Sequence, residues 1–426
     1  MMRIFALGLA LFLVAGSAPV RAAAPDVDAA QLLFESAKDK VLKIRVVLNA
    51  TQSQAAVGSG FLVSGDGLVV TNFHVVSDFL ERPAEYTVEY VRHDGRTGPL
   101  RLINVDVIHD LALLRIRGRD LPHFRLVSHM LEKGERGYSL GNPHDLGLTI
   151  VEGTYSGLIT ESLYEHIHFT GAINPGMSGG PAITRDGEVF GVNVSRLVEA
   201  ELVSFLVPVK FVRELLAATR DESATPEALL RRARDQILGA QNATLSRLLA
   251  APLPTAALGG YRVPASVGEF MRCWGRAEDE QTKLYRASTQ ICSLEDAIFV
   301  FENVRTGWID FEHTLLESRK LGWMRFYKLY ETRFATVANP PPGLEEDFTE
   351  FRCRTEFVHN DSLMLRAAIC LRAYKRLPGL YDLWMRAATL DAYDHGLQTT
   401  LTLLGVSFDN GERFAQRYLE AISRMK

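Results

Sequence analysis

The stretch Asn174-Pro175-Gly176-Met177-Ser178-Gly179-Gly180-Pro181 places one serine among glycines and prolines. A hydroxyl is a poor nucleophile at neutral pH, and it needs a neighbouring base and hydrogen-bond donors for the developing oxyanion. The glycines permit a tight turn that exposes the Ser178 hydroxyl and lets the amides of Gly176 and Ser178 point at one spot. We therefore expect Ser178 to be a nucleophile, with these two amides as its oxyanion hole.

The same window fits the Gly-x-Ser-x-Gly motif of α/β-hydrolases, in which a helix directly follows the serine. Gly179-Gly180-Pro181 follows Ser178 here, and this run opposes a helix. That fold also carries its acid and its histidine after the serine, whereas the best candidates in this chain precede it. The α/β-hydrolase interpretation is therefore rejected.

His74 is the candidate base for this serine. It lies in the run Val69-Val70-Thr71-Asn72-Phe73-His74-Val75-Val76, which predicts a strand from Leu68 to Val76 with the histidine near its end. A lone histidine in such a run is more often structural than catalytic, so its role depends on an acid that orients it.

Asp110 is the candidate acid, and Asp106 competes with it. Asp110 opens the apolar run Leu111–Ile116, where a half-buried carboxylate can accept a hydrogen bond from imidazole. The chain order His, Asp, Ser is the order of chymotrypsin. We therefore predict a catalytic triad of His74, Asp110 and Ser178.

Short apolar runs separated by glycine- and proline-containing turns fill the chain from Val41 to about Val207. This pattern is typical of an antiparallel sandwich or barrel. Helices are predicted before it, over residues 29–40, and after it, from Pro208 to Thr219. A further helix is expected to start at Thr225-Pro226, which suit an N-cap and a first helical position, and to end near Gly239.

Several segments of this region together resemble trypsin-like serine proteases of the HtrA/Deg type, over roughly residues 30–218. They are Gly58-Ser59-Gly60-Phe61, Thr71-Asn72-Phe73-His74-Val75-Val76, Asp110-Leu111-Ala112-Leu113-Leu114, Gly141-Asn142-Pro143 and Ile173 to Pro181. The resemblance implies a mainly β, chymotrypsin-like pair of six-stranded barrels, with His74 and Asp110 in the first barrel and Ser178 in the second. It also implies serine endopeptidase activity.

The resemblance extends to a specificity pocket. Val203–Pro208 resembles the strand that lines this pocket in the family, so Ser204 and Phe205 join the predicted substrate-binding residues. Ala172, six residues before Ser178, is by resemblance the base of the pocket. An uncharged residue at the base of the pocket cannot form an ion pair with a substrate lysine or arginine. We therefore expect a small or apolar residue before the cleaved bond.

Two features depart from the family pattern. Met177 stands just before the serine, where HtrA proteins usually have asparagine. This keeps open the alternative of a binding or scaffold protein that retains the protease fold with little turnover. The chain after Leu253 shows no carboxylate-binding loop of the PDZ type, so recognition of peptide tails is not carried over.

Four cysteines, Cys273, Cys292, Cys353 and Cys370, lie in the C-terminal part of the chain. An even count in an exported protein indicates disulfides. The pairs Cys273–Cys292 and Cys353–Cys370 are favoured because each closes a short loop. The lack of a Cys-x-x-Cys knuckle argues against a zinc site. No metal site and no cofactor are predicted.

Residues 221–260 are predicted to be a helical linker, and residues 261–426 a disulfide-containing C-terminal domain of uncertain, mixed α+β fold. Phe270-Met271-Arg272-Cys273 resembles Phe351-Arg352-Cys353, which suggests a duplication; chance similarity is an equal alternative. The two repeats would cover residues 261–338 and 344–426. This domain is also a candidate for binding an unidentified ligand.

The first 22 residues have the pattern of a signal peptide. One arginine precedes an apolar run from Ile4 to about Ala15, which at about twelve residues is short for a bilayer span, and small residues favour cleavage after Ala22. We expect an exported protein, periplasmic or alternatively secreted, with no stable membrane insertion after cleavage. An uncleaved membrane anchor is the alternative.

The chain has 426 residues, a length that suggests two or three domains. Its 47 lysines and arginines against 51 aspartates and glutamates give a net charge of −4, so there is no electrostatic reason to expect nucleic-acid binding. The prediction is a protease domain over residues 23–220 that acts on protein or peptide substrates. The resemblance also admits a homo-oligomer.

Overall fold

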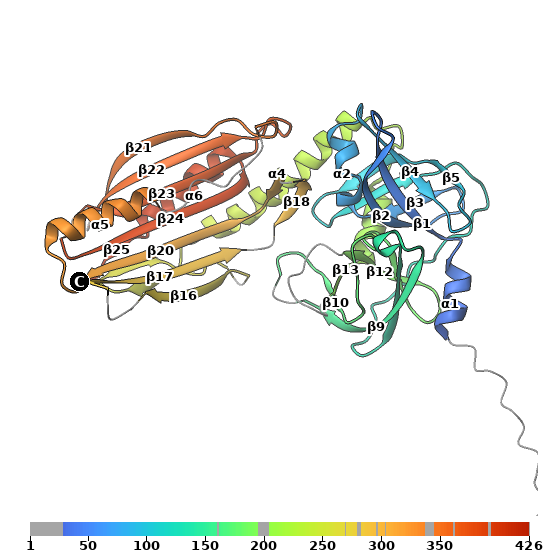
Figure 1. Cartoon of the computed structure of the whole chain (residues 1–426), viewed down its shortest axis with the longest axis horizontal. Helices are drawn as coiled ribbons and strands as arrows, with labels where there is room; N and C mark the ends of the chain where they lie inside the picture. Colours follow the sequence, from blue (N-terminus) through green and yellow to red (C-terminus); the bar gives the residue numbers. More distant parts are fainter. Residues whose placement is uncertain are drawn as a thin grey trace, which may run out of the picture.

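The structure is a computed structural model that describes residues 29–159, 162–194, 204–268, 270–278, 283–294, 297–302, 304–336, 345–360, 363–390 and 393–425. Two β-rich lobes lie along the long axis of the molecule, and helix α4 (Pro226–Leu249) runs from one to the other (Figure 1). We call residues 29–219 the N-terminal lobe and residues 251–425 the C-terminal lobe. The predicted signal peptide lies outside the described residues. In the described part of the chain, no helix is both long and apolar enough to span a membrane.

The first half of the N-terminal lobe is an antiparallel sheet of seven strands in the order β5-β4-β1-β2-β3-β7-β6. Its strands are β1 (Val41–Leu48), β2 (Ser53–Leu62), β3 (Leu68–Thr71), β4 (Tyr86–Val91), β5 (Thr97–Pro99), β6 (Arg101–Asp106) and β7 (Leu111–Arg115). The structure therefore has an open seven-stranded sheet here in place of the expected six-stranded barrel. β5 pairs with β4 because a tight turn at Asp94-Gly95 folds the chain back on itself.

The second half of the lobe is a closed barrel in the strand order β10-β13-β12-β11-β8-β9. Its strands are β8 (Arg136–Gly141), β9 (Thr149–Leu158), β10 (Ile167–Phe169), β11 (Pro181–Ile183), β12 (Val189–Val194) and β13 (Ser204–Pro208). One apolar cluster includes Phe61 and Val70 of the sheet together with Leu140 and Val192 of the barrel. The predicted mainly β, double-barrel type of fold is confirmed.

The strand predicted over Leu68–Val76 is wrong in its second half. β3 ends at Thr71, and helix α2 (Phe73–Glu81) follows, so His74 lies in the first turn of a helix. The carboxylate of Asp110 accepts a hydrogen bond from the His74 amide (2.9 Å) and so satisfies one of the donors at the helix N-terminus. The valines after His74 suggested a strand, but this tertiary contact decides the local structure.

The helices on either side of the β region agree with the prediction, as α1 (Ala29–Ala37) and α3 (Val209–Ala218). α4 has Thr225 as its N-cap, as predicted, but it continues past Gly239 to Leu249. Its later turns bury Leu245 and Leu249 in the core of the C-terminal lobe. Because a glycine inside a helix costs only about 1 kcal/mol, this burial outweighs it.

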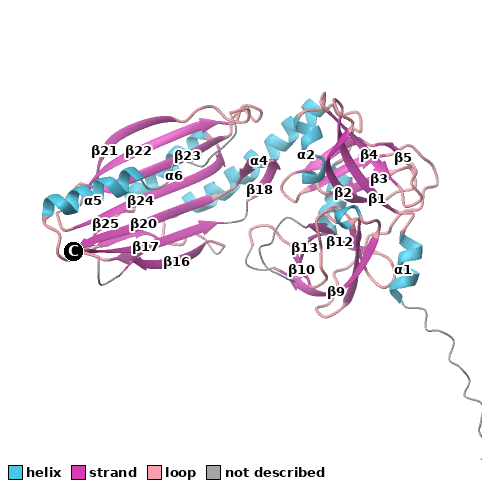
Figure 2. Ribbon diagram, in the orientation of Figure 1, coloured by secondary structure: helices cyan, strands magenta, loops and turns pink. Residues whose placement is uncertain are grey.

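The C-terminal lobe is built on an antiparallel sheet of seven strands in the order β16-β17-β20-β24-β23-β22-β21 (Figure 2). Its strands are β16 (Arg272–Glu278), β17 (Tyr285–Leu294), β20 (Ile309–Ser318), β21 (Arg352–Asn360), β22 (Leu363–Ala373), β23 (Tyr381–Thr389) and β24 (His395–Val406). Helix α6 (Phe408–Glu420) packs on one face, and α5 (Trp323–Thr336) covers part of the other. The lobe therefore has a mixed α+β fold.

Two smaller β elements complete this lobe. β14 (Thr255–Leu258), β15 (Tyr261–Pro264) and β25 (Ser423–Arg424) form a three-stranded sheet. Residues 251–260 are therefore not a plain linker, since β14 pairs with β15. β18 (Ile298–Phe301) and β19 (Val304–Thr306) form a separate two-stranded hairpin.

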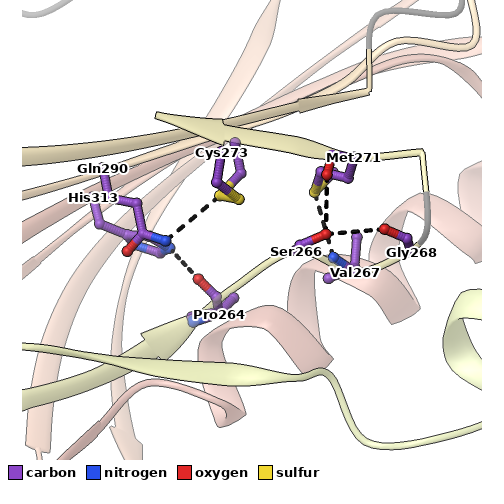
Figure 3. The surroundings of a disulfide bond; sticks show 9 residues. Pro264, Ser266, Val267, Gly268, Met271, Cys273, Gln290 and His313 are labelled. Atoms are coloured by element: carbon purple, nitrogen blue, oxygen red, sulfur yellow. Dashed lines mark hydrogen bonds between the residues drawn. A yellow bond between two sulfur atoms is a disulfide. The ribbon is translucent and has the colours of Figure 1, made fainter. Parts of the chain in front are cut away.

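A disulfide joins each edge strand of the large C-terminal sheet to its neighbour. Cys273 on β16 bonds Cys292 on β17, and Cys353 on β21 bonds Cys370 on β22, which is the pairing that the sequence favoured. Figure 3 shows the first of these bonds, where the Gln290 side-chain amide donates to the sulfur of Cys292 (3.7 Å). The matching positions of the two disulfides at opposite edges are compatible with a duplication, which stays a prediction.

The two lobes share one apolar core. Ile298, Val300 and Phe301 of the β18–β19 hairpin belong to the same buried cluster as Val76 and Leu80 of α2. The C-terminal lobe therefore packs directly on the helix that carries His74.

A polar contact at the end of α2 adds to this interface. The Arg376 guanidinium donates to the Glu81 carbonyl (2.7 Å) and lies 3.5 Å from the Glu81 carboxylate. Burial raises the pKa of Glu81 to about 7, with Arg376 and Arg82 opposing the rise and Asp347 adding to it. Burial, with the charge of Glu346, also raises the pKa of Asp347. The interface therefore holds a carboxyl group that titrates near neutral pH.

Glu81 should make stability depend on pH. Its pKa is higher in the folded protein than in the unfolded chain, so its stabilising contribution is complete below about pH 4.5 and is lost as the pH rises through about 7. Relative to Glu81→Gln, the wild type should lose about 2 kcal/mol of unfolding free energy between about pH 5 and pH 8. Urea unfolding at both pH values measures this loss.

The exposed neighbour Glu85 provides the control for this experiment. Glu85→Gln should keep the pH dependence of the wild type. The assignment would be contradicted if Glu81→Gln and the wild type had the same pH dependence.

Candidate active site

The Ser178 loop belongs to the barrel, and hydrogen bonds tie it to the neighbouring sheet. The Ser59 amide on β2 donates to the Ser178 carbonyl (2.8 Å), and the Ser59 hydroxyl donates to the Gly176 carbonyl (2.8 Å). The same hydroxyl accepts from the Asn142 amide (2.9 Å). Because Ser59 is fully buried, water does not compete for these bonds. They hold the loop at the junction of sheet and barrel.

Two glycines of this loop have backbone conformations that other residues rarely adopt. Gly176 has a φ of +94° and Gly179 a φ of +81°. A Cβ on Gly176 would overlap the carbonyl oxygen of Asn142, and one on Gly179 would overlap the Thr71 hydroxyl. The tight turn inferred from the glycines is therefore present, and it presses the loop against the end of β3.

The orientation of the two predicted oxyanion-hole amides follows from the carbonyls that precede them. The Pro175 carbonyl accepts from the His144 amide (2.9 Å), and the Met177 carbonyl accepts from the Gly180 amide (3.0 Å). In a trans peptide the N–H points opposite to the C=O. The amides of Gly176 and Ser178, which follow these two carbonyls, therefore point away from His144 and Gly180.

Met177, which departs from the family pattern, is fully buried. A Cβ on Gly141 at the end of β8 would lie 2.9 Å from the Met177 Cβ, so the two segments are in close contact. The Asn193 side-chain amide also donates to the Met177 carbonyl (3.3 Å). The buried methionine therefore lies close against the end of β8, and Asn193 fixes its carbonyl.

His74 and Asp110 make a contact at two points. The ring Nδ1 of His74 lies 2.6 Å from one carboxylate oxygen and donates to it, because an ionised carboxylate only accepts. The His74 amide donates to the other oxygen (2.9 Å). The Asp110 carbonyl accepts from the Asn72 side chain (2.9 Å) and the Phe73 amide (3.0 Å). The imidazole is thus oriented with Nε2 left as the nitrogen that can accept a proton.

Asp106, the competing acid, is bound elsewhere. Its carboxylate lies 2.7 Å from Nδ1 of His109 and accepts from the His109 amide (3.1 Å). The His109 ring stacks on Phe211 with ring centroids 3.6 Å apart. The structure therefore brings Asp110, and not Asp106, to His74.

Strand β2 brings the serine loop and the histidine helix to one place. A Cβ on Gly58 would lie 3.1 Å from the Ser178 carbonyl and 2.6 Å from the side chain of Val75, the residue after His74. Ser178 is 2% exposed and the His74 side chain 9%. Ser178 and His74, two members of the predicted triad, thus lie at the same nearly closed junction between sheet and barrel.

The predicted pocket residues lie on the barrel. Ala172 is exposed, and the amide of the next residue, Ile173, donates to the hydroxyl of the buried Ser204 (3.2 Å). Phe205 is half-buried and pairs with His168 across β13 and β10. The structure therefore brings Ala172 and Ser204 together and places Phe205 on the adjoining strand.

One residue at this site was missed by the sequence analysis. Phe299 of β18, in the C-terminal lobe, has its ring centroid 6.0 Å from that of His74, with the planes at 86°. No motif surrounds Phe299, so only the packing of the two lobes reveals it.

One known protein family matches the part of the chain that holds His74, Asp110 and Ser178. Residues 58–192 match the family model of the trypsin-like peptidase domain. This stretch resembles a trypsin-like peptidase domain, and we refer to it as the peptidase domain. The resemblance to HtrA/Deg-type proteases that the motifs indicated is confirmed for it.

The chain is similar to proteins that are named as serine proteases. It is 38% identical over 151 residues to a "Probable periplasmic serine endoprotease DegP-like" of Chlamydia pneumoniae, covering 34% of this chain and 30% of that protein. It is 34% identical over 181 residues to "Serine protease HTRA1" of Xenopus tropicalis, covering 40% of this chain and 38% of that protein. The chain spans about a third of the length of these curated relatives.

Solved protease structures match somewhat less than half of the chain. A serine endoprotease from Yersinia pestis is 25% identical, with a TM-score of 0.38, over 43% of this chain and 64% of that chain. The HtrA-type protease AlgW with a tripeptide is 26% identical, with a TM-score of 0.38, over 44% of this chain and 62% of that chain.

Among the described residues, no group of three or more histidine, cysteine or carboxylate side chains is placed to hold a metal ion.

Removing the Ser59 hydroxyl should destabilise the peptidase domain. Ser59→Ala leaves the Gly176 carbonyl and the Asn142 amide without their buried partner, which should lower the unfolding free energy by about 1–3 kcal/mol. Denaturant unfolding measures this change. Ser64→Ala, in the β2–β3 turn, is the matched control and should cost less, because Ser64 is only half-buried. Equal losses in both variants would contradict the role given to Ser59.

Proposed function

We propose that the peptidase domain is a serine endopeptidase. Ser178 is the nucleophile, His74 the general base and then the general acid, and Asp110 the orienting carboxylate. The observation that supports this best is the two-point contact between His74 and Asp110 beside the Ser178 loop.

The reaction follows from these positions. The Ser178 hydroxyl oxygen attacks the substrate carbonyl carbon while its proton passes to Nε2 of His74, and Asp110 stabilises the imidazolium that forms. The oxyanion accepts hydrogen bonds from the amides of Gly176 and Ser178, each worth about 3–4 kcal/mol in the transition state. When the C–N bond breaks, His74 returns the proton to the leaving amine. Water then hydrolyses the acyl-enzyme by the same steps.

Protein or peptide segments are the proposed substrates, with a small or apolar residue before the cleaved bond. The uncharged Ala172 beside Ser204 supports this preference, because neither residue can pair with a substrate lysine or arginine. The described peptidase domain holds no acidic residue at these predicted pocket positions.

Export, to the periplasm or alternatively to the outside of the cell, is proposed as well. The pattern of residues 1–22, the two disulfides and the word "periplasmic" in the name of a relative support it. The protease domain over residues 23–220, the domain over 261–426 with its unidentified ligand, and a homo-oligomer also stay proposals.

A serine-directed fluorophosphonate probe tests the proposed function. The wild type should be labelled, and Ser178→Ala should not be, because only an activated hydroxyl reacts. A folded wild type that is not labelled would instead favour a scaffold protein. The low exposure of Ser178 supports that alternative.

Hydrolysis of fluorescein-labelled casein tests the role of the acid. Asp110→Asn should lower kcat about 10²- to 10⁴-fold, because an amide cannot hold the imidazole in the required tautomer. Asp106→Asn is the matched control and should keep the activity, since Asp106 binds His109. Equal activity in the two variants would contradict the assignment of Asp110.

A further inference from the structure

We propose that Phe299, which the C-terminal lobe contributes, is a positioning and specificity residue of the active site. Its ring restrains the imidazole of His74 and places an apolar surface beside the peptide bond that is cleaved. This inference rests on the proposed function, because it needs His74 to be the general base.

The contact between the two rings has a favourable geometry. The centroids lie 6.0 Å apart and the ring planes are nearly perpendicular, at 86°. Perpendicular arrangements are among those that aromatic quadrupoles prefer. Asp110 fixes one ring nitrogen of His74, but a single side-chain hydrogen bond leaves the ring free to tilt. Phe299 supplies a second contact, and two contacts in different directions define the orientation of the ring.

The burial pattern of β18 separates Phe299 from its neighbours. Ile298, Val300 and Phe301 are each at most 2% exposed, whereas Phe299 is only partly buried. A residue that served only the shared core would be covered like the other three. Phe299 packs against the shared core as well, but part of its surface stays exposed, and its ring also contacts His74.

The hairpin that carries Phe299 is held from both sides. On one side, its buried residues pack with α2 in the core shared by the lobes. On the other, the Gly307 amide just after β19 donates to the Leu404 carbonyl of β24 (2.8 Å), and Thr306 packs against Gly405. The main sheet of the C-terminal lobe therefore fixes where Phe299 lies relative to the imidazole.

The chemistry of the proposed reaction puts the substrate beside this ring. A general base must come within about 2.6–3.2 Å of the proton that it takes and of the leaving group to which it returns the proton. A side chain that touches the imidazole therefore lies next to the substrate residues that flank the cleaved bond. An apolar ring favours apolar substrate side chains there and offers nothing to charged ones.

Steady-state kinetics on a matched peptide series test the inference. The series varies the two residues that flank the cleaved bond among alanine, leucine and aspartate, and it compares the full-length wild type with Phe299→Ala, Phe299→Leu and Val300→Ala. Phe299→Ala should lower kcat/KM about 10- to 100-fold and weaken the preference for leucine over aspartate. Phe299→Leu should keep most of the wild-type kcat/KM and most of the preference for leucine, because leucine is an apolar side chain of similar length.

Val300→Ala separates this role from simple stability. Val300 is fully buried in the same strand and belongs to the core shared by the lobes, so its truncation should lower the melting temperature but keep kcat/KM and the substrate preference. The inference is overturned if Phe299→Ala behaves like the wild type, if Val300→Ala loses as much activity and selectivity, or if Phe299→Ala is faster because the ring hinders substrate binding.

Failure of the proposed function gives a different result. A folded wild type that is neither labelled by the fluorophosphonate nor able to cleave casein overturns both proposals. An active wild type with an unaffected Phe299→Ala variant overturns only the role of Phe299.

Discussion

The carboxylate of Asp110 connects two parts of the chain on which the site depends. One of its oxygens accepts from the backbone of His74 and starts α2, while the other accepts from the imidazole and orients it. The same group therefore sets both the local secondary structure and the direction of a side chain. This arrangement needs a φ of +53° at Asp110, a left-handed conformation that aspartate tolerates better than most residues. The hydrogen bonds around Asp110 offset this backbone strain.

Three separate parts of the chain meet at this junction. The first half of the N-terminal lobe supplies His74, Asp110 and the buried Ser59, the barrel supplies the Ser178 loop, and the C-terminal lobe supplies Phe299. α4 crosses from one lobe to the other, and its buried residues belong to the cores of both. The C-terminal lobe is thus packed into the peptidase part of the molecule rather than tethered to it.

Sequence reasoning worked where short motifs carry the information. The glycines around Ser178 predicted the tight turn, and the loop lengths between the cysteines predicted both disulfides. It failed where a contact between residues far apart in the sequence determines the local structure. The start of α2 depends on Asp110, and the second half of α4 depends on burial in a lobe that follows it in the chain. Phe299 reaches His74 only through the packing of whole lobes, which no periodicity or spacing records.

The two disulfides also bear on how this protein behaves among copies of itself. β16 and β21 are the outermost strands of the large C-terminal sheet and are exposed along most of their length. Unpaired outer strands are templates for adding a strand from another chain, and a slip of one residue would turn every side chain over. Cys273 lies directly opposite Cys292, and Cys353 opposite Cys370, so each covalent bond locks its strand in register. The register of both outer strands therefore depends on the redox state of the compartment in which the chain folds.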